Sequence, residues 1–150
     1  YKEITFNNRK IIVNYQLSII NHQLQMKVPA KYYDEQFEFK GQWDMPSKCG
    51  LKIFDYKGKK VVVVTELYQE NPGTSVTYAG ASLANQICEA KGFDVNNVIY
   101  VECNPDTSSK LSFYDEEFFQ VTFTIADGKF TGTPQYHQLT ADEAKEMITL

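Results

Sequence analysis

The hydrophobic pattern of this chain is clearest near its centre. Residues Val61–Val64 form an unbroken apolar run, and Val98–Val101 form a second one. Apolar runs without alternation are typical of strands that are covered on both faces of a sheet. Between them, Val76–Lys91 carries apolar residues at helical spacing. The pattern therefore predicts a βαβ unit, with two adjacent parallel strands and a right-handed crossover.

The sequence also marks the ends of this helix. Pro72 and Gly73 prevent an earlier start, and Thr74 or Ser75 can cap the first turn. Gly92 suits the left-handed position that follows a helix. The apolar stripe that should face the sheet consists of Val76, Ala79, Leu83, Ile87 and Ala90.

Two turn signals predict antiparallel hairpins. The Gly in Tyr56-Lys57-Gly58-Lys59 joins the apolar segments Leu51–Asp55 and Lys60–Glu66. Asp127-Gly128 follows an alternating segment from Phe119 to Ile125 and should return the chain through Lys129–Thr131.

The remaining segments complete an α+β pattern. Phe37 and Phe39 alternate with charged residues in a short strand that should end at Gly41, and Pro46 and Gly50 indicate a loop after it. We expect a polar linker over residues 135–138. After it, Thr140-Ala141-Asp142-Glu143 has the form of a capping box at the start of a short helix. The predicted fold is a mixed sheet with one βαβ unit (Val61–Val101), antiparallel hairpins, one long helix and one short helix.

The chain of 150 residues is long enough for one compact domain and short for two. A near-repeat of the form Asn-x-Gln-Leu starts at Asn14 and again at Asn21, in a segment rich in Asn, Gln and Ile. Residues 1–25 therefore read either as an N-terminal appendage or as an edge strand, and 26–150 as a single α+β domain. We expect a chain that begins at Met26 to fold.

Composition narrows the function classes. The net charge of −4 and the pI of about 5.2 disfavour nucleic-acid binding. No apolar run approaches the length of a membrane-spanning helix, about 18 residues. The three cysteines, Cys49, Cys88 and Cys103, form no CxxC motif. We expect buried free thiols, a cytoplasmic location and no cofactor.

The loop before the helix is the first candidate site. Asn71, Gly73, Thr74, Ser75 and Thr77 place hydroxyl and backbone N–H groups where a helix N-terminus attracts anions. The loop lacks the Lys of a P-loop and fits no glycine-rich phosphate motif. The alternative interpretation is a turn and a helix cap with no ligand.

Carboxylates at strand ends are the second candidate. Glu66 and Glu102 follow the two central apolar runs, and Asp106 lies in the next loop. If the strands are parallel neighbours, the carboxylates approach each other and could act as a general acid–base pair or hold Mg²⁺. In the alternative, both glutamates point into solvent at the strand ends.

Two further features suggest weaker hypotheses. Cys103 at a strand end could serve as a nucleophile with His137 as its base. An aromatic group could anchor a partner protein or complete the core as a lid; it consists of Tyr32, Tyr33, Phe37, Phe39 and Trp43.

The stretch from Val61 through Cys88 resembles small uncharacterised bacterial proteins, a resemblance that implies no activity and no site residues. The sequence therefore favours a small bacterial-type binding or interaction module. Its ligand would be a partner protein or a small anion at the crevice beyond the strand ends. The alternative is a metal-assisted hydrolase or transferase that uses Glu66 and Glu102.

Overall fold

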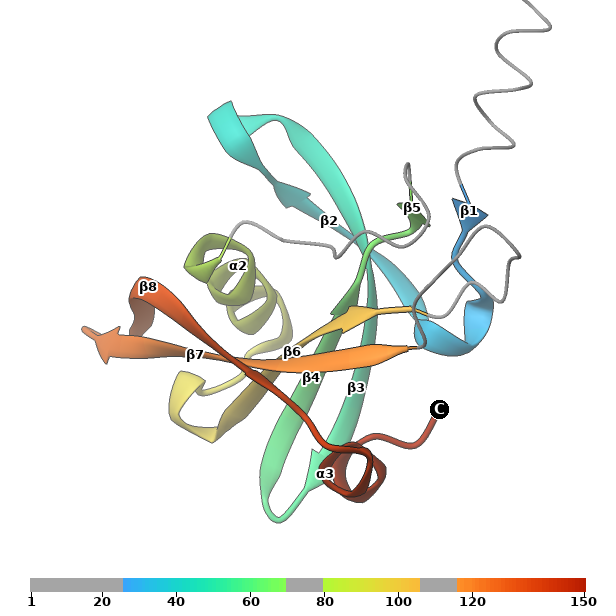
Figure 1. Ribbon diagram of the computed structural model, residues 1–150. Coiled ribbons are helices and arrows are strands. Elements are labelled where there is room, and N and C mark those ends of the chain that lie inside the picture. Colours follow the sequence, from blue (N-terminus) through green and yellow to red (C-terminus); the bar gives the residue numbers. More distant parts are fainter. Residues whose placement is uncertain (1–25, 70–79, 106–115) are drawn as a thin grey trace, which may run out of the picture.

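A computed structural model describes residues 26–69, 80–105 and 116–150. It is an α+β fold in which a mixed six-stranded sheet carries two helices (Figure 1). The division into residues 1–25 and 26–150 stays a prediction, because residues 1–25 lie outside the described part. The strands are β1 (Met26–Lys27), β2 (Glu35–Lys40), β3 (Pro46–Tyr56), β4 (Lys59–Thr65), β5 (Tyr68–Gln69), β6 (Val98–Asn104), β7 (Glu117–Ala126) and β8 (Lys129–Gln138). The helices are α2 (Ala81–Lys91) and α3 (Ala141–Met147), with single 3₁₀ turns at Ala30–Tyr32, Gln42–Asp44 and Val95–Asn97.

The strand order of the sheet is β2-β3-β4-β6-β7-β8. Only β4 and β6 are parallel in it, with Val62 beside Tyr100 and Val64 beside Glu102. All other neighbours are antiparallel hairpin partners. The predicted parallel pair is therefore confirmed, and α2 connects its two strands. A separate short pair, β1 with β5, lies outside this sheet.

Both faces of the central strands are covered, as the unbroken valine run predicts. Val62 and Val64 belong to a core beneath α2, whereas Val61 and Val63 belong to a core on the opposite face. The α2 core also contains Phe39, Cys49, Leu51, Leu83, Ala84, Ile87, Cys88, Val95, Tyr100, Val121 and Phe130. The opposite core contains Val28, Tyr32, Val101, Cys103, Phe118, Leu139 and Ile148.

Helix α2 begins later than its apolar spacing suggests. Its N-cap is Gly80, whose φ of 60° and ψ of −136° are not helical, so the expected start at Val76 is wrong. Ala90 is exposed rather than part of the buried stripe, which instead includes Cys88. The predicted end is confirmed, since Gly92 has a φ of 70° and its N–H bonds back to the last turn. No helix in the described segments is long and apolar enough to cross a membrane.

Two segments expected to be irregular are strands instead. Pro46 opens β3, and Gly50 lies within it, paired with Gln36 on β2 and Thr65 on β4. A Cβ at Gly50 would stand 2.8 Å from the Tyr33 Cβ, so the packing of Tyr33 requires glycine at this strand position. Residues 135–138, expected as a linker, form the end of edge strand β8. That strand is mostly exposed, so polar side chains suit it and hide its strand character.

The predicted hairpin turns and the C-terminal cap are confirmed. Lys57 and Gly58 join β3 to β4 with positive φ at both residues, and so do Asp127 and Gly128 between β7 and β8. The Thr140 hydroxyl accepts a hydrogen bond from the Glu143 N–H, while the Glu143 carboxylate accepts one from the Thr140 N–H. This capping box starts α3.

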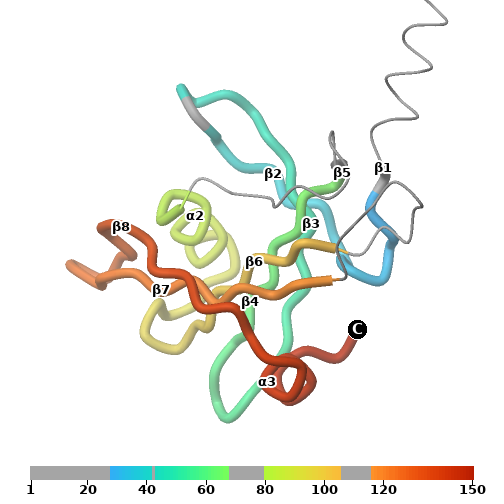
Figure 2. The backbone as a smooth tube through the Cα atoms, in the orientation of Figure 1, coloured from blue at the N-terminus to red at the C-terminus, as the bar shows by residue number. Residues whose placement is uncertain are grey.

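Two adjacent amide side chains tie α2 to both outer strands of the sheet. The Asn85 amide group donates to the Phe130 carbonyl and accepts from the Phe130 N–H, each at 2.9 Å. Gln86 makes the same pair of bonds with the backbone of Lys40, at 2.9 and 2.8 Å. Successive residues differ by about 100° around a helix, so the two amides leave α2 on opposite sides of its buried stripe. In Figure 2 α2 accordingly lies between the β2–β3 hairpin and the β7–β8 hairpin.

Replacing Asn85 by Ala should lower the free energy of unfolding by about 1–3 kcal/mol, because it leaves a partly buried N–H and carbonyl of Phe130 without partners. Gln86→Ala should cost less, about 0.5–1.5 kcal/mol, since its bonds are exposed to water. Urea denaturation measures both values. Glu89→Ala, an exposed position on the same helix, is the matched control. Equal losses in all three variants would show that the amide bonds of Asn85 and Gln86 do not hold α2 to the outer strands.

Candidate functional site

A polar group interrupts the buried surface at the C-terminal end of β6. Glu102 and Asn104 are both only 3% exposed. They share the face of Tyr100, which lies in the core beneath α2, because side chains two residues apart on a strand point the same way. Burying a carboxylate and an amide costs free energy unless both are well bonded, so their presence here calls for an explanation other than packing.

Hydrogen bonds extend this group across three strands. The Asn104 side-chain amide donates to Glu117 on β7 at 3.1 Å, and the Gln138 amide on β8 donates to the other oxygen of the same carboxylate, also at 3.1 Å. Glu117 stands directly beside Asn104 in the sheet register. We call Asn104, Glu117 and Gln138 the strand-end network; the buried Glu102 lies next to it, two residues before Asn104 on the same face of β6.

The charge of Glu102 raises the pKa of two nearby tyrosine side chains. Burial raises the pKa of Tyr100 well above its usual value, and the field of the Glu102 carboxylate adds to this rise. The same two causes raise the pKa of Tyr136 on β8, a residue that is about half exposed. The Tyr100 hydroxyl is buried and has no hydrogen-bond partner in the described part of the chain.

A cavity of about 460 Å³ opens beside the network, between the ends of β7 and β8 and helix α3. Its polar lining includes Glu117, Gln138 and Lys145, and its apolar lining includes Phe118, Leu139 and Ile148. A volume of this size lies within the range of small-ligand pockets, about 300–1,000 Å³. Its lining suits a ligand with an apolar body and a polar end.

The two predicted carboxylates lie at the same edge of the sheet. Glu66 directly follows β4 and is half-buried, whereas Glu102 is fully buried on the adjacent parallel strand. Asp106, the third suggested metal ligand, lies outside the described residues. Among residues 26–69, 80–105 and 116–150, no three His, Cys, Asp or Glu side chains group closely enough to hold a metal ion.

The suggested anion-binding residues, Asn71, Gly73, Thr74, Ser75 and Thr77, also lie outside the described residues. Because α2 starts at Ala81, all of them precede the first turn of that helix in sequence. The anion site therefore stays a prediction.

Cys103 is buried in the core opposite α2 and is 1% exposed. Burial raises the pKa of its thiol well above the ordinary value, and the hydroxyl of Thr65, its neighbour on β4, only partly offsets this rise. Burial also raises the pKa of Cys49 to about 12 and that of Cys88 to about 11. All three cysteines are free and buried, as predicted, and a thiol with a raised pKa is a poor nucleophile.

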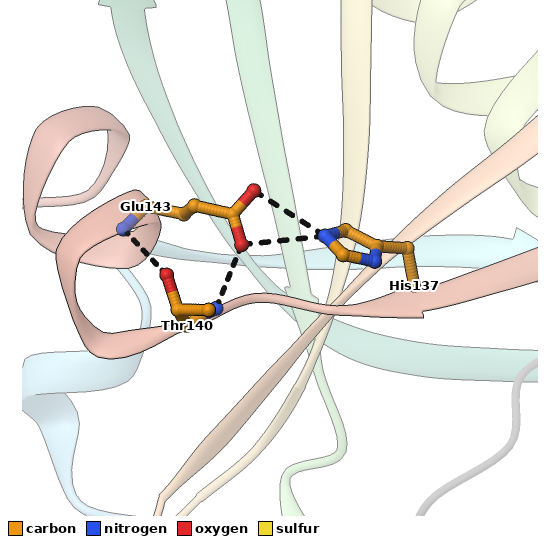
Figure 3. A network of polar contacts seen from close by, with 3 residues as sticks. All are labelled: His137, Thr140 and Glu143. Carbon is orange, nitrogen blue, oxygen red and sulfur yellow. Dashed lines mark hydrogen bonds and ion pairs between the residues drawn. The ribbon is translucent and has the colours of Figure 1, made fainter.

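His137 lies away from Cys103. It stands on β8, two strands from β6 and roughly 10 Å across the sheet at the usual strand spacing. Figure 3 shows its ring beside the capping box of α3, with Nε2 at 3.3 Å from both carboxylate oxygens of Glu143. The structure thus joins His137 to the start of α3 rather than to a thiol.

The sequence reasoning missed three members of the network, Asn104, Glu117 and Gln138. A signal existed for two of them. Asn104 lies two residues after Glu102, so both side chains point to the same face of the strand. Glu117 likewise shares a face with Phe119 and the alternate apolar residues that follow it. Gln138 gave no such signal because its segment was expected to be a linker.

Comparison with known proteins adds nothing to this geometry, since no family model, no curated protein and no solved structure matches the chain. The candidate site therefore stands on its own residues.

The Glu143 contacts predict a pH-dependent contribution to stability. The hydrogen bond from the Thr140 backbone, and then that from His137, hold the pKa of Glu143 below its ordinary value of 4.5. A carboxyl group whose pKa is lower in the folded state stabilises the protein at a pH above its unfolded-state pKa. This stabilisation is lost as the pH falls through the folded-state pKa. Glu143→Gln should therefore destabilise the protein at pH 7 and have little effect near pH 3.

Urea denaturation at the two pH values checks this expectation. Glu89→Gln, at an exposed helical position, is the control and should change stability little at either pH. An equal loss for Glu143→Gln at pH 7 and pH 3 would show that the ionised carboxylate has no role.

Proposed function

We propose that this chain is a small binding module whose ligand site is the crevice at the C-terminal ends of β4 and β6. One observation carries the proposal: Glu102 and Asn104 are buried there, and Asn104 belongs to a hydrogen-bond network with Glu117 and Gln138. Ligands of α/β sheets with adjacent parallel strands commonly bind at this edge. The cavity beside Glu117 and Gln138 supplies space next to the network.

The charges of the crevice favour a partner protein over a small anion. Glu66, Glu102 and Glu117 gather at one edge of the sheet, and three carboxylates repel phosphate or another carboxylate. The cavity beside this edge is lined by Glu116 and Glu117 against the single Lys145, so its net charge is also negative. A lysine or arginine side chain of a partner suits this lining, since it has an aliphatic stem and a cationic end. The three free, buried thiols support a reducing, cytoplasmic setting for this module.

A titration of the full chain with small cationic probes tests the proposal. N-acetyl-arginine amide should shift the NMR amide signals of Asn104, Glu117 and Gln138, while phosphate should not. Glu117→Gln removes a charged acceptor and should weaken probe binding about tenfold. Glu38→Gln, at an exposed carboxylate on β2, is the matched control. Shifts by phosphate alone, or by the cation equally in both variants, would contradict the proposal.

A second candidate is a metal-assisted hydrolase or transferase that uses Glu66 and Glu102. The specific observation in its favour is that Glu102 is buried rather than splayed into solvent, on the strand next to the one that ends before Glu66. Two carboxylates at one sheet edge are a start for a Mg²⁺ site, which needs further oxygen ligands from water or substrate.

Paramagnetic Mn²⁺ distinguishes the metal site from the binding module. If Glu66 and Glu102 hold a divalent ion, micromolar Mn²⁺ should broaden the amide signals around both residues, and excess Mg²⁺ should reverse the effect. Glu102→Gln should abolish the broadening, whereas Glu38→Gln should leave it unchanged. Broadening that spreads evenly over surface carboxylates would exclude the metal site.

A further inference from the structure

Basic and acidic residues are unevenly distributed along this chain. Residues 4–33 include four basic and no acidic side chains, whereas residues 34–150 carry 18 acidic and 10 basic ones. A basic pair followed by three apolar residues, Arg9–Val13, stands in the first of these parts, and we call it the basic segment. A basic stretch on an otherwise acidic chain suggests that the two parts attract each other.

The cavity between the ends of β7 and β8 and helix α3 has the chemistry that suits the basic segment. Phe118, Leu139 and Ile148 supply apolar surface, and Glu117 lies beside them. Both oxygens of the Glu117 carboxylate accept hydrogen bonds, but the donors are the neutral amides of the strand-end network. None of the ion pairs within the described residues includes Glu117, which is only half-buried, so its charge is accessible to a cation.

The other carboxylate of the cavity, Glu116, is already engaged. It accepts a hydrogen bond from the Tyr32 hydroxyl at 2.7 Å and lies 4.0 Å from the Lys31 ammonium. Lys145 also lines the cavity, but in the described part of the chain it forms no ion pair with either carboxylate. Glu117 is therefore the carboxylate of this cavity that can anchor a further cation.

The described chain begins at the same edge of the sheet as this cavity. Strand β1 pairs with β5, which follows the C-terminal end of β4 after only two residues. Tyr32, six residues after Met26, is fully buried, and its hydroxyl reaches the cavity wall at Glu116. In Figure 1 β1 and the C-terminal end of the chain accordingly lie on the same side of the molecule. Twelve residues lie between Val13 and Met26 and can span up to about 40 Å, so the basic segment can reach the cavity.

We propose that the basic segment occupies this cavity within the same chain. The inference rests on the proposed function, since it supplies from the chain itself the kind of ligand proposed for the site. The Arg9 guanidinium meets the Glu117 carboxylate, and Ile11–Val13 cover the apolar lining. A tethered segment has an effective concentration of about a millimolar. A contact with a dissociation constant of about 0.1–0.2 mM then keeps the site about 80–90% occupied, and a partner must displace the segment to bind.

A spin label beside the basic segment tests where that segment lies in the full chain. The three natural cysteines are buried, so a thiol-specific nitroxide should react only with the introduced thiol of Asn7→Cys. The label should broaden the amide signals of Glu117, Phe118 and Ala144, and it should spare Gly128 at the far end of β7.

Broadening that is absent at the cavity, or equal at Gly128, would overturn the proposal. Mixing nitroxide-bearing chains with isotope-labelled chains that lack the nitroxide identifies contacts between molecules. Broadening at the cavity in that mixture, as strong as within one chain, would overturn the intramolecular contact and indicate a second copy as the occupant.

Removing the two cations should open the site. Arg9→Gln/Lys10→Gln should bind N-acetyl-arginine amide about five- to tenfold more tightly than the natural chain does, and broadening at the cavity should disappear. Lys2→Gln/Lys59→Gln loses the same two charges outside the basic segment, with Lys59 at an exposed position, and is the matched control. It should bind the probe as the natural chain does.

The probe titration separates this inference from the proposed function. Equal affinity in the natural chain, the variant and the control would overturn the docking of the basic segment and leave the binding site standing. Absence of binding in all three chains would overturn the binding site itself, and the docked segment with it.

Discussion

Parallel strands cannot be joined by a tight turn, and β4 and β6 are parallel neighbours at the centre of the sheet. The chain must therefore cross one face of the sheet between them, and α2 belongs to that crossing. Everything else can be built as antiparallel hairpins on either side, β2-β3-β4 and β6-β7-β8. Glu66 and Glu102 lie at adjacent strand ends for the same reason, because only this pair of neighbouring strands has its two C-terminal ends side by side.

Side-chain hydrogen bonds, as well as apolar packing, hold the crossing helix α2 to the sheet. Asn85 and Gln86 bond the backbone of Phe130 and Lys40, which belong to the two outermost strands. A six-stranded sheet must twist for its opposite edges to reach one helix, and strand twist supplies that curvature. These bonds also occupy backbone N–H and C=O groups of two edge strands, which would otherwise be open to pairing with other chains.

Sequence reasoning succeeded where local chemistry decides the structure. Four adjacent valines admit only a strand buried on both faces, Gly58 and Gly128 fit turns with positive φ, and Thr140 with Glu143 forms a cap within four residues. It failed where a distant residue decides. Gly50 lies within a strand because β2 and β4 pair with it, and residues 135–138 form a strand because β7 lies beside them. The candidate site was found in part, through Glu102, because its partners come from strands whose register no local pattern fixes.

The three cysteines mark the two layers of the fold separately. Cys49 on β3 and Cys88 on α2 lie in the core beneath the helix, while Cys103 on β6 lies in the opposite core. None is accessible in the folded chain, so a thiol reagent can modify each only after its own layer opens. The order in which the three are modified under native conditions thus records which side of the sheet comes apart first, and the natural chain needs no introduced label for that measurement.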